Sequence, residues 1–306
     1  MTNRLGKQVL KGVSRSFYLT LRLLPRPMRE AASLGYLLAR TSDTLADTAA
    51  APLDARLQCM DLFRRAVAGE SDPPRWPMAV LNAISDPRER HLLESSAEVF
   101  VGLRSLPEAE AALVREVVAI IITGQTFDLQ RFTAATQEHP ISLRDDAELE
   151  DYTWRVAGCV GAFWTKLGFL TRGDQFSNCG ESQLLDLGIA YGKGLQMVNI
   201  LRDVAEDLKS GRCYLPVADP TDSELLLACH SRWLMKTEGW VRQGELYAKT
   251  LGSRRMRAAT VLPAMIADKT LKFLRTTTWE ALQTRTKVPR SEIYRSVVRA
   301  FLLAPE

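Results

Sequence analysis

The sequence predicts an all-α fold, a single helical domain spanning residues 1–306 with long helices around a central cavity. Long segments carry apolar residues at the three- and four-residue spacing of a helix, and no alternating strand pattern of useful length occurs. No low-complexity linker divides the chain. With 306 residues, of which 46% are hydrophobic and 25% charged, the composition is ordinary for a globular protein with a sizeable core.

The helical pattern runs through most of the chain and is interrupted by loops rich in proline, glycine or polar residues. The loops are predicted at 69–77, 133–145 and 171–181. A basic segment at 7–17 is predicted as a helix or an ordered flap. The other helices are predicted at 28–50, 53–68, 88–103, 108–132, 152–169, 187–211, 230–250, 256–277 and 291–303. Ser142 or Asp145 would begin a helix after the second loop, and Pro263 would kink the helix that contains it.

One face of the helix predicted at 187–211 is acidic and rich in amides. Its polar members lie at i, i+3, i+7 and i+11, within a quarter-turn of the surface, and are Gln196, Asn199, Asp203 and Asp207. The apolar stripe behind them consists of Met197, Leu201, Val204 and Leu208. Two aspartates four residues apart repel each other, and Mg²⁺, which takes oxygen ligands and leaves sites for water and phosphate, would offset that repulsion. A solvated helix face balanced by nearby basic residues would show the same pattern, so this segment alone leaves both interpretations open.

A second helix repeats the arrangement and favours the metal site. The residues at i, i+4, i+7 and i+11 of this face are Tyr36, Arg40, Asp43 and Asp47. If the two helices face each other across a bundle, four carboxylates converge with Arg40 and Arg202 nearby. Such a group would clamp a pyrophosphate through bridging metal ions.

The segment at 152–169 combines large and very small residues. Tyr152, Val156 and Phe163 share one helical face, whereas Gly158 and Gly161 remove side-chain bulk midway along it. Glycine lowers helix propensity, so we expect it to make room for something. Close helix packing and space for a substrate are both compatible with the pattern.

Four sequence motifs together resemble the squalene/phytoene synthase family of head-to-head prenyl transferases. They are SRSF at 14–17, DTLAD at 43–47, YTWRVAGCVG at 152–161, and LQMVNILRDVAED at 195–207 followed by GRCYLP at 211–216. The motifs stand in the order of the family and cover the chain from about residue 10 to residue 216. The last ninety residues resemble the family weakly, through their helical pattern and the KVPRSEIY segment.

The resemblance implies an isoprenoid synthase-type bundle that joins two farnesyl diphosphates through presqualene diphosphate to squalene, with NADPH as reductant. It implies two or three Mg²⁺ ions held by Asp43, Asp47, Asn199, Asp203 and Asp207. The same four aspartates are the implied catalytic residues together with Tyr152, which matches the tyrosine assigned acid/base work. The implied substrate-binding residues are Ser14, Arg15, Ser16, Phe17, Tyr36, Arg40, Val156, Ala157, Gly158, Gln196, Asn199 and Arg202. The resemblance also favours space for a substrate over close packing at 152–169, since a break near Gly158 would admit the growing isoprenoid. An NADPH site would include Ser14, Arg15 and Asn199.

Squalene is the expected product, but the support for it is unequal. The DTLAD motif, with Thr44 after the first aspartate, resembles squalene-type enzymes, whereas Ala46 replaces an acidic residue that is common in them. No G-x-G-x-x-G fingerprint marks a dinucleotide site. Dehydrosqualene, presqualene diphosphate or phytoene synthesis without reduction therefore remains an alternative, as does a chain-elongating prenyltransferase or terpene cyclase. A non-catalytic assembly protein of the same fold is the alternative of another class, and loss of an aspartate pair would mark it.

Composition argues against several other classes of protein. No apolar run approaches the roughly 18 residues of a membrane span, and a net charge of +4 is too small to indicate a nucleic-acid partner. The five cysteines show no metal-ligand spacing, and their odd number argues against a closed disulfide framework. We expect a cytoplasmic protein whose partner is farnesyl diphosphate. Basic residues between 242 and 257 are interpreted as a solvated helix face, with peripheral contact to the inner membrane left open. The oligomeric state is not predicted.

Overall fold

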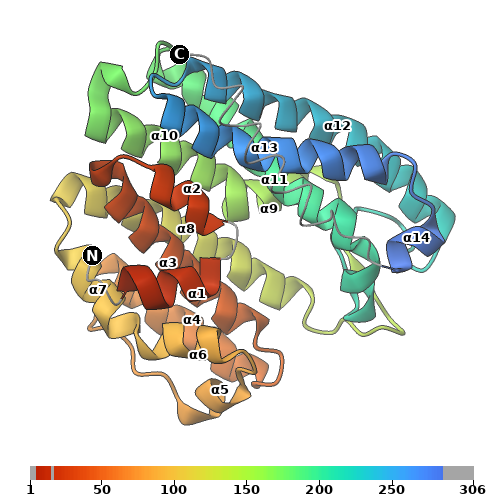
Figure 1. Cartoon of the computed structure of the whole chain (residues 1–306). Coiled ribbons are helices and arrows are strands. Elements are labelled where there is room, and N and C mark those ends of the chain that lie inside the picture. Colours follow the sequence, from red (N-terminus) through yellow and green to blue (C-terminus); the bar gives the residue numbers. More distant parts are fainter. Residues whose placement is uncertain (1–4, 15–16, 285–306) are drawn as a thin grey trace. The chain divides into compact units, whose positions relative to one another are not determined.

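The computed structural model describes residues 5–14 and 17–284, and this part of the chain is built from helices, loops and one pair of very short strands (Figure 1). It divides into two compact units. Of the described residues, those up to 130 together with 166–173 form one unit, and 131–165 together with 174–284 form the other. The all-α prediction is confirmed, whereas the assignment of residues 1–306 to one domain stays a prediction. The helix predicted at 291–303 lies outside the described residues.

The first unit is built around a long helix, α3, that packs against α1, α2, α4, α6 and α7. A π-helical turn at Leu5–Val9 precedes α1 (Leu10–Ser14), α2 (Phe17–Leu23) and α3 (Arg26–Asp47). The next elements are α4 (Leu53–Ala68), α5 (Met78–Ala83), α6 (Pro87–Glu94), α7 (Ser96–Arg104) and α8 (Glu108–Arg131). Leu34, Leu37, Leu38 and Leu45 of α3 are fully buried, as their spacing predicts. The α4 prediction matches residue for residue.

Two helix boundaries in this unit differ from prediction for local reasons. The helix expected at 88–103 is two helices, α6 and α7, separated at Ser95. The side chain of Asp86 caps α6 by accepting a hydrogen bond from the backbone N–H of Arg88. Helix α3 ends at Asp47 rather than at residue 50, and the Thr48 hydroxyl donates to the Thr44 carbonyl over 2.6 Å at this end.

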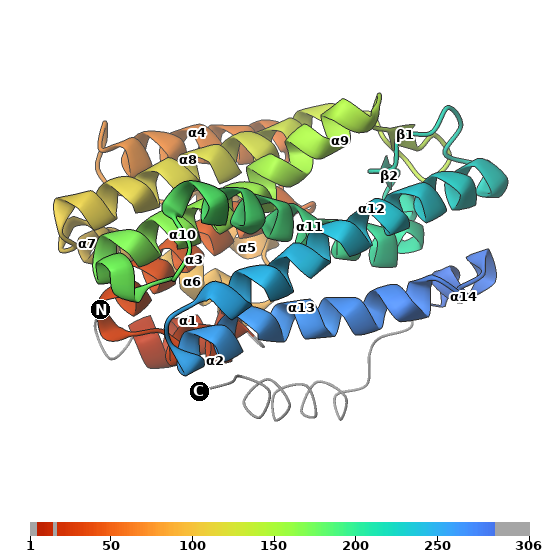
Figure 2. The same cartoon turned by 90° about the horizontal axis from the view of Figure 1, so that it is seen from above.

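The second unit is built around α11 (Glu181–Lys209), which packs against α12 (Ser223–Thr250) and α13 (Arg254–Leu274). These three helices lie side by side in both views (Figures 1 and 2). The unit also contains α9 (Asp146–Thr153), a π-helical turn at Trp154–Gly158, a short 3₁₀ turn at Gly173–Gln175 and α14 (Trp279–Gln283). Helix α10 (Cys159–Arg172) contributes residues to both units. Asp145 caps α9, which confirms one of the two predicted starts.

The helix predicted at 152–169 is interrupted by the π-helical turn, and its glycines pack closely against α11. A Cβ atom at Gly161 would lie 1.9 Å from the carbonyl oxygen of Gly188, and one at Gly192 would lie 2.3 Å from that of Ala157. Any side chain at these positions would collide with backbone. Of the two interpretations left open by the sequence, close helix packing is therefore the one that these contacts support.

Two-residue strands were not expected from the sequence, because such a pair is too short to show alternation. Strand β1 (Ile141–Ser142) pairs in parallel with β2 (Arg212–Cys213), with Ile141 opposite Arg212 (Figure 2). Gly211, just before β2, has φ of 79°, and a Cβ there would lie 2.5 Å from the Thr136 nitrogen. The pair fixes the chain that follows α11.

Pro263 lies within α13, which continues to Leu274. Whether the axis bends there stays a prediction. None of the described helices combines the length and the apolar character that a membrane span requires.

Candidate active site on two acidic helix faces

The α3 face holds a polar cluster drawn from three helices of the first unit. Arg40 forms one ion pair with Asp43, on the same helix, and another with Glu89 of α6. Gln125 of α8 donates a hydrogen bond from Nε2 to Oδ1 of Asp43 over 3.3 Å. Asp47, one turn beyond Asp43, is exposed. Residues of α3, α6 and α8 therefore meet at the first of the two predicted metal ligands on this face.

The charges of this cluster do not balance. Loss of solvation by the surrounding protein and the negative charge of Asp47 raise the pKa of Asp43 to about 7, against the lowering effect of Arg40. Oε1 of Gln125 is buried and has no hydrogen-bond partner among the described residues. Excess negative charge beside a buried oxygen acceptor suits a hydrated divalent cation. The residues on this face therefore fit Mg²⁺.

The α11 face carries a second pair of aspartates next to a guanidinium. Arg202 donates two hydrogen bonds to the carboxylate of Asp203, of which the Nε–Oδ1 bond is 2.9 Å long. The bond to Asp203 and the charges of Asp203 and Asp207 raise the pKa of Arg202. Asn199 is exposed, and Gln196 is half-buried. This set of carboxylate and amide oxygens also fits Mg²⁺.

The side of α11 behind these polar residues is apolar and buried, as predicted. Met197, Leu201 and Val204 are at most 3% exposed, and Leu208 is half-buried. Within the described residues, no three histidine, cysteine or carboxylate side chains form a group able to hold a metal ion by themselves. A metal at either aspartate pair would complete its coordination with water or substrate oxygens. The expectation that the two aspartate pairs act together stays a prediction.

Tyr152 lies in the last turn of α9 and is 7% exposed. Its ring stacks on that of Tyr214, with centroids 5.1 Å apart and planes inclined by 21°. Tyr214 follows β2 directly and also meets the ring of Phe132 edge-on, at 5.2 Å. The short strand pair therefore places an aromatic wall against the predicted acid/base residue.

The predicted phosphate-holding segment at the start of the chain is described in part. Ser14 is buried, and its hydroxyl donates to the Leu10 carbonyl of its own helix. Tyr36 donates from its hydroxyl to the Val13 carbonyl over 3.2 Å, which joins α3 to α1. Arg15, Ser16 and the side chain of Phe17 lie outside the described residues. Roles of this segment in substrate or NADPH binding stay predictions.

Glu89 and Gln125 belong to the candidate site but were not identified as site residues from the sequence. Gln125 is separated from its partner Asp43 by 82 residues in the sequence. The signal in the sequence that could have identified Gln125 was a polar amide side chain on a helix with an apolar pattern. No comparable signal marked Glu89. Val156 and Ala157 are half-buried in the π-helical turn, and Gly158 is buried there.

Comparisons with known proteins identify the family to which the chain belongs. Residues 10–292 match the squalene/phytoene synthase family. The chain is 32% identical over 207 residues to a presqualene diphosphate synthase of Zymomonas mobilis, an alignment that covers 66% of this chain and 56% of that protein. It is 32% identical over 218 residues to a phytoene synthase of Mycobacterium tuberculosis, covering 70% and 57% of the two chains. The chain thus spans a little over half the length of these relatives.

A solved complex of TcSQS with the ligand BPH1237 has the same fold. It superimposes with a TM-score of 0.79 at 22% identity, covering 98% of this chain and 87% of that one. This likeness confirms the isoprenoid synthase-type all-α fold. With the family match over most of its length, the chain belongs to the squalene/phytoene synthase family.

Proposed function

We propose that the protein condenses two farnesyl diphosphates head to head in a Mg²⁺-dependent reaction and reduces the product to squalene with NADPH. The observation that carries this proposal is the presence of an aspartate pair and a paired guanidinium on each of α3 and α11. A non-catalytic assembly protein would have no use for two intact charged faces of this kind. The names of the relatives support prenyl diphosphate chemistry but differ in product.

The side chains of both faces would hold Mg²⁺ and diphosphate. Asp43 and Asp47 on α3, with Asn199, Asp203 and Asp207 on α11, supply carboxylate and amide oxygens. When bound, Mg²⁺ neutralises a diphosphate and makes it a better leaving group. Arg40 and Arg202, which pair with Asp43 and Asp203, would supply further positive charge to the phosphate oxygens.

Tyr152 would handle the proton lost when the first allylic cation attacks the 2,3 double bond of the second substrate. Its position is fixed by the stack on Tyr214, and its side chain is buried. Exclusion of water at this point protects a carbocation from capture. The departing diphosphate is the alternative proton acceptor, with Tyr152 orienting it.

The reductive step is the part of the proposal with a direct alternative. If the chain uses no NADPH, the same residues lead to presqualene diphosphate, dehydrosqualene or, from the longer substrate, phytoene. Of the residues proposed for NADPH, Asn199 is exposed on α11. A solvent-facing amide beside the aspartate pair is compatible with a nicotinamide nearby but does not select it.

Competition between substrates tests which product the chain makes. Purified protein is supplied with equal amounts of farnesyl and geranylgeranyl diphosphate, Mg²⁺ and NADPH, and the hydrocarbons are separated by chromatography. The proposal predicts C30 products in excess. Phytoene as the main product would show that geranylgeranyl diphosphate, rather than farnesyl diphosphate, is the substrate. Elongation of the farnesyl chain would overturn head-to-head condensation altogether.

A further inference from the structure

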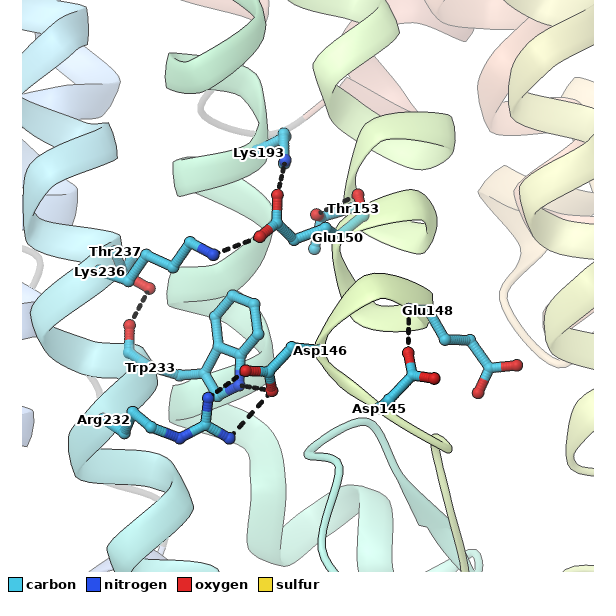
Figure 3. A network of polar contacts seen from close by, with 10 residues as sticks. All are labelled: Asp145, Asp146, Glu148, Glu150, Thr153, Lys193, Arg232, Trp233, Lys236 and Thr237. Atoms are coloured by element: carbon cyan, nitrogen blue, oxygen red, sulfur yellow. Dashed lines mark hydrogen bonds and ion pairs between the residues drawn. The ribbon is translucent and has the colours of Figure 1, made fainter.

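A single carboxylate on α9 binds two lysines from two other helices (Figure 3). Glu150 accepts a hydrogen bond from Lys193 of α11, with Nζ and Oε2 2.7 Å apart, and a second from Lys236 of α12. Both ammonium groups also lie over the indole of Trp240, at 4.4 Å and 5.2 Å from its centroid. One carboxylate and one aromatic face thus hold two cations that would otherwise repel each other.

The same helix is fixed again one turn earlier. Asp146 accepts hydrogen bonds from Arg232, at 2.9 Å for Nη2, and from the indole nitrogen of Trp233, at 3.2 Å (Figure 3). Against the raising effect of partial burial, hydrogen bonds from Lys193 and Lys236 lower the pKa of Glu150, which keeps it ionised. Helix α9 is therefore joined to α12 at two successive turns and to α11 through Lys193.

Lys193 differs from the other cations of this group because it also contacts the π-helical turn. Its Nζ binds Glu150, and its stem packs on the π-helical turn, where a Cβ at Gly158 would lie 3.0 Å from its Cγ. Its side chain is 14% exposed, compared with 42% for Lys236. The Lys193 side chain thus contacts both ends of the segment 150–158, and we call this pair of contacts the bracket. Tyr152 lies inside this segment.

The bracketed segment is the irregular part of the helix. A π-helical turn shifts the register of every residue around it and is tolerated where outside contacts hold it. Tyr152 lies between the two points that Lys193 contacts, so loss of these contacts would let the segment that carries Tyr152 move relative to α11. We propose that Lys193 and Glu150 are positioning residues for Tyr152. This inference rests on the function proposed above for that tyrosine.

Hydrogen exchange of the substrate-free protein tests the bracket without any activity. Lys193→Met keeps the stem that covers Gly158 and removes the charge, and Lys193→Arg restores the charge. Lys236→Met is the matched control, because it removes a cation from the same carboxylate and the same indole without touching Gly158. Amides of residues 153–158 are expected to exchange about tenfold faster in Lys193→Met and Glu150→Gln, but at nearly the wild-type rate in Lys193→Arg and Lys236→Met. Equal exchange in Lys193→Met and wild type would overturn the bracket.

A double-mutant cycle with Tyr152→Phe tests the positioning role. In single turnover with farnesyl diphosphate and Mg²⁺, Lys193→Met is expected to slow presqualene diphosphate formation about ten- to hundredfold with unchanged substrate affinity. In the Tyr152→Phe background it should cause no further loss, because both changes remove the same contribution. Equal losses in both backgrounds would show that Lys193 acts independently of Tyr152 and would refute the inference.

The cycle separates this inference from the proposed function. A Tyr152→Phe protein that reacts at the wild-type rate would refute the role of the tyrosine and, with it, the positioning role. If wild-type protein leaves farnesyl diphosphate unchanged, the proposed function fails, and the inference that rests on it fails too. The exchange comparison then shows whether Lys193 still serves as a purely structural clamp.

Discussion

The side-chain amide of Gln125 donates a hydrogen bond to the carboxylate of Asp43, with Nε2 and Oδ1 3.3 Å apart. The amide nitrogen is the donor, and the carboxylate oxygen accepts the bond. The amide oxygen is consequently turned elsewhere and is buried with no hydrogen-bond partner in the part of the chain that the structure describes. One residue on α8 thus orients a proposed metal ligand on α3 and leaves an acceptor for a metal-bound water.

Gln125→Leu removes both the donor and this acceptor at nearly constant volume. The dissociation constant for Mg²⁺, measured by calorimetry in the presence of inorganic pyrophosphate, is expected to rise about tenfold, as is typical when a partner of a metal ligand is lost. Gln137→Leu, at an exposed loop position, is the matched control and should leave affinity unchanged. Equal affinities in the two variants would show that Gln125 does not support the metal site.

Asp203→Asn keeps the shape of the side chain and removes the charge proposed to bind metal. Turnover is expected to fall by at least about a hundredfold. The substitution relieves the repulsion between Asp203 and Asp207 but also removes the ion pair of Asp203 with Arg202. We therefore expect the free energy of unfolding to change by less than about 1 kcal/mol. Wild-type turnover in this variant at ordinary Mg²⁺ would remove Asp203 from the metal site.

Tyr152→Phe retains the ring that stacks on Tyr214 and deletes the hydroxyl. Presqualene diphosphate formation in single turnover should slow by about 10²- to 10⁴-fold, the range of general acid/base catalysis, while stability is nearly kept. Tyr247→Phe is the contrasting variant, because its buried hydroxyl bonds Thr165 over 2.8 Å. It should lose about 1 kcal/mol of stability and keep the rate of this step. A reversed pattern would exchange the roles of the two tyrosines.

Protonation of the buried His230 makes the free energy of unfolding depend on pH. Burial lowers the pKa of this imidazole from its ordinary value of 6.5, against the raising effect of its 3.0 Å hydrogen bond with the Leu201 carbonyl. The folded state therefore binds fewer protons than the unfolded state, and the stability contributed by neutral His230 is lost as pH falls from 6.5 toward the lower folded pKa. Urea unfolding at about pH 7.5 and about pH 5 should show a larger loss in wild type than in His230→Gln. Equal losses would mean that other groups control acid stability.

Most helices could be predicted from the sequence, because burial of one face gives a period that residues display locally. Helix α4 and the buried stripe of α3 are examples. The break at Ser95 could not be predicted, since the apolar period continues across it and the end of α6 depends on a local turn. The family resemblance implies a break near Gly158, but the π-helical form of the turn at Trp154–Gly158 could not be predicted, because its register is held by contacts with α11.

The candidate site divides in the same way. The partners within one helix, such as Arg40 with Asp43, follow from spacing and were predicted to share a face. Glu89 and Gln125 come from other helices, and no spacing rule connects them with Asp43. The stack of Tyr214 on Tyr152 likewise depends on a strand pair of two residues each. Contacts that depend on how helices pack were therefore beyond the sequence argument.

The most direct test of the central claim is the fate of labelled farnesyl diphosphate supplied as the sole prenyl substrate. Wild-type protein, Asp43→Asn and Asp203→Asn are each incubated with Mg²⁺, with and without NADPH, and the products are identified by chromatography. We expect squalene from wild type with NADPH, presqualene diphosphate or dehydrosqualene without it, and almost no condensation by either variant. Unchanged farnesyl diphosphate with wild-type protein, or equal condensation by all three proteins, would contradict it.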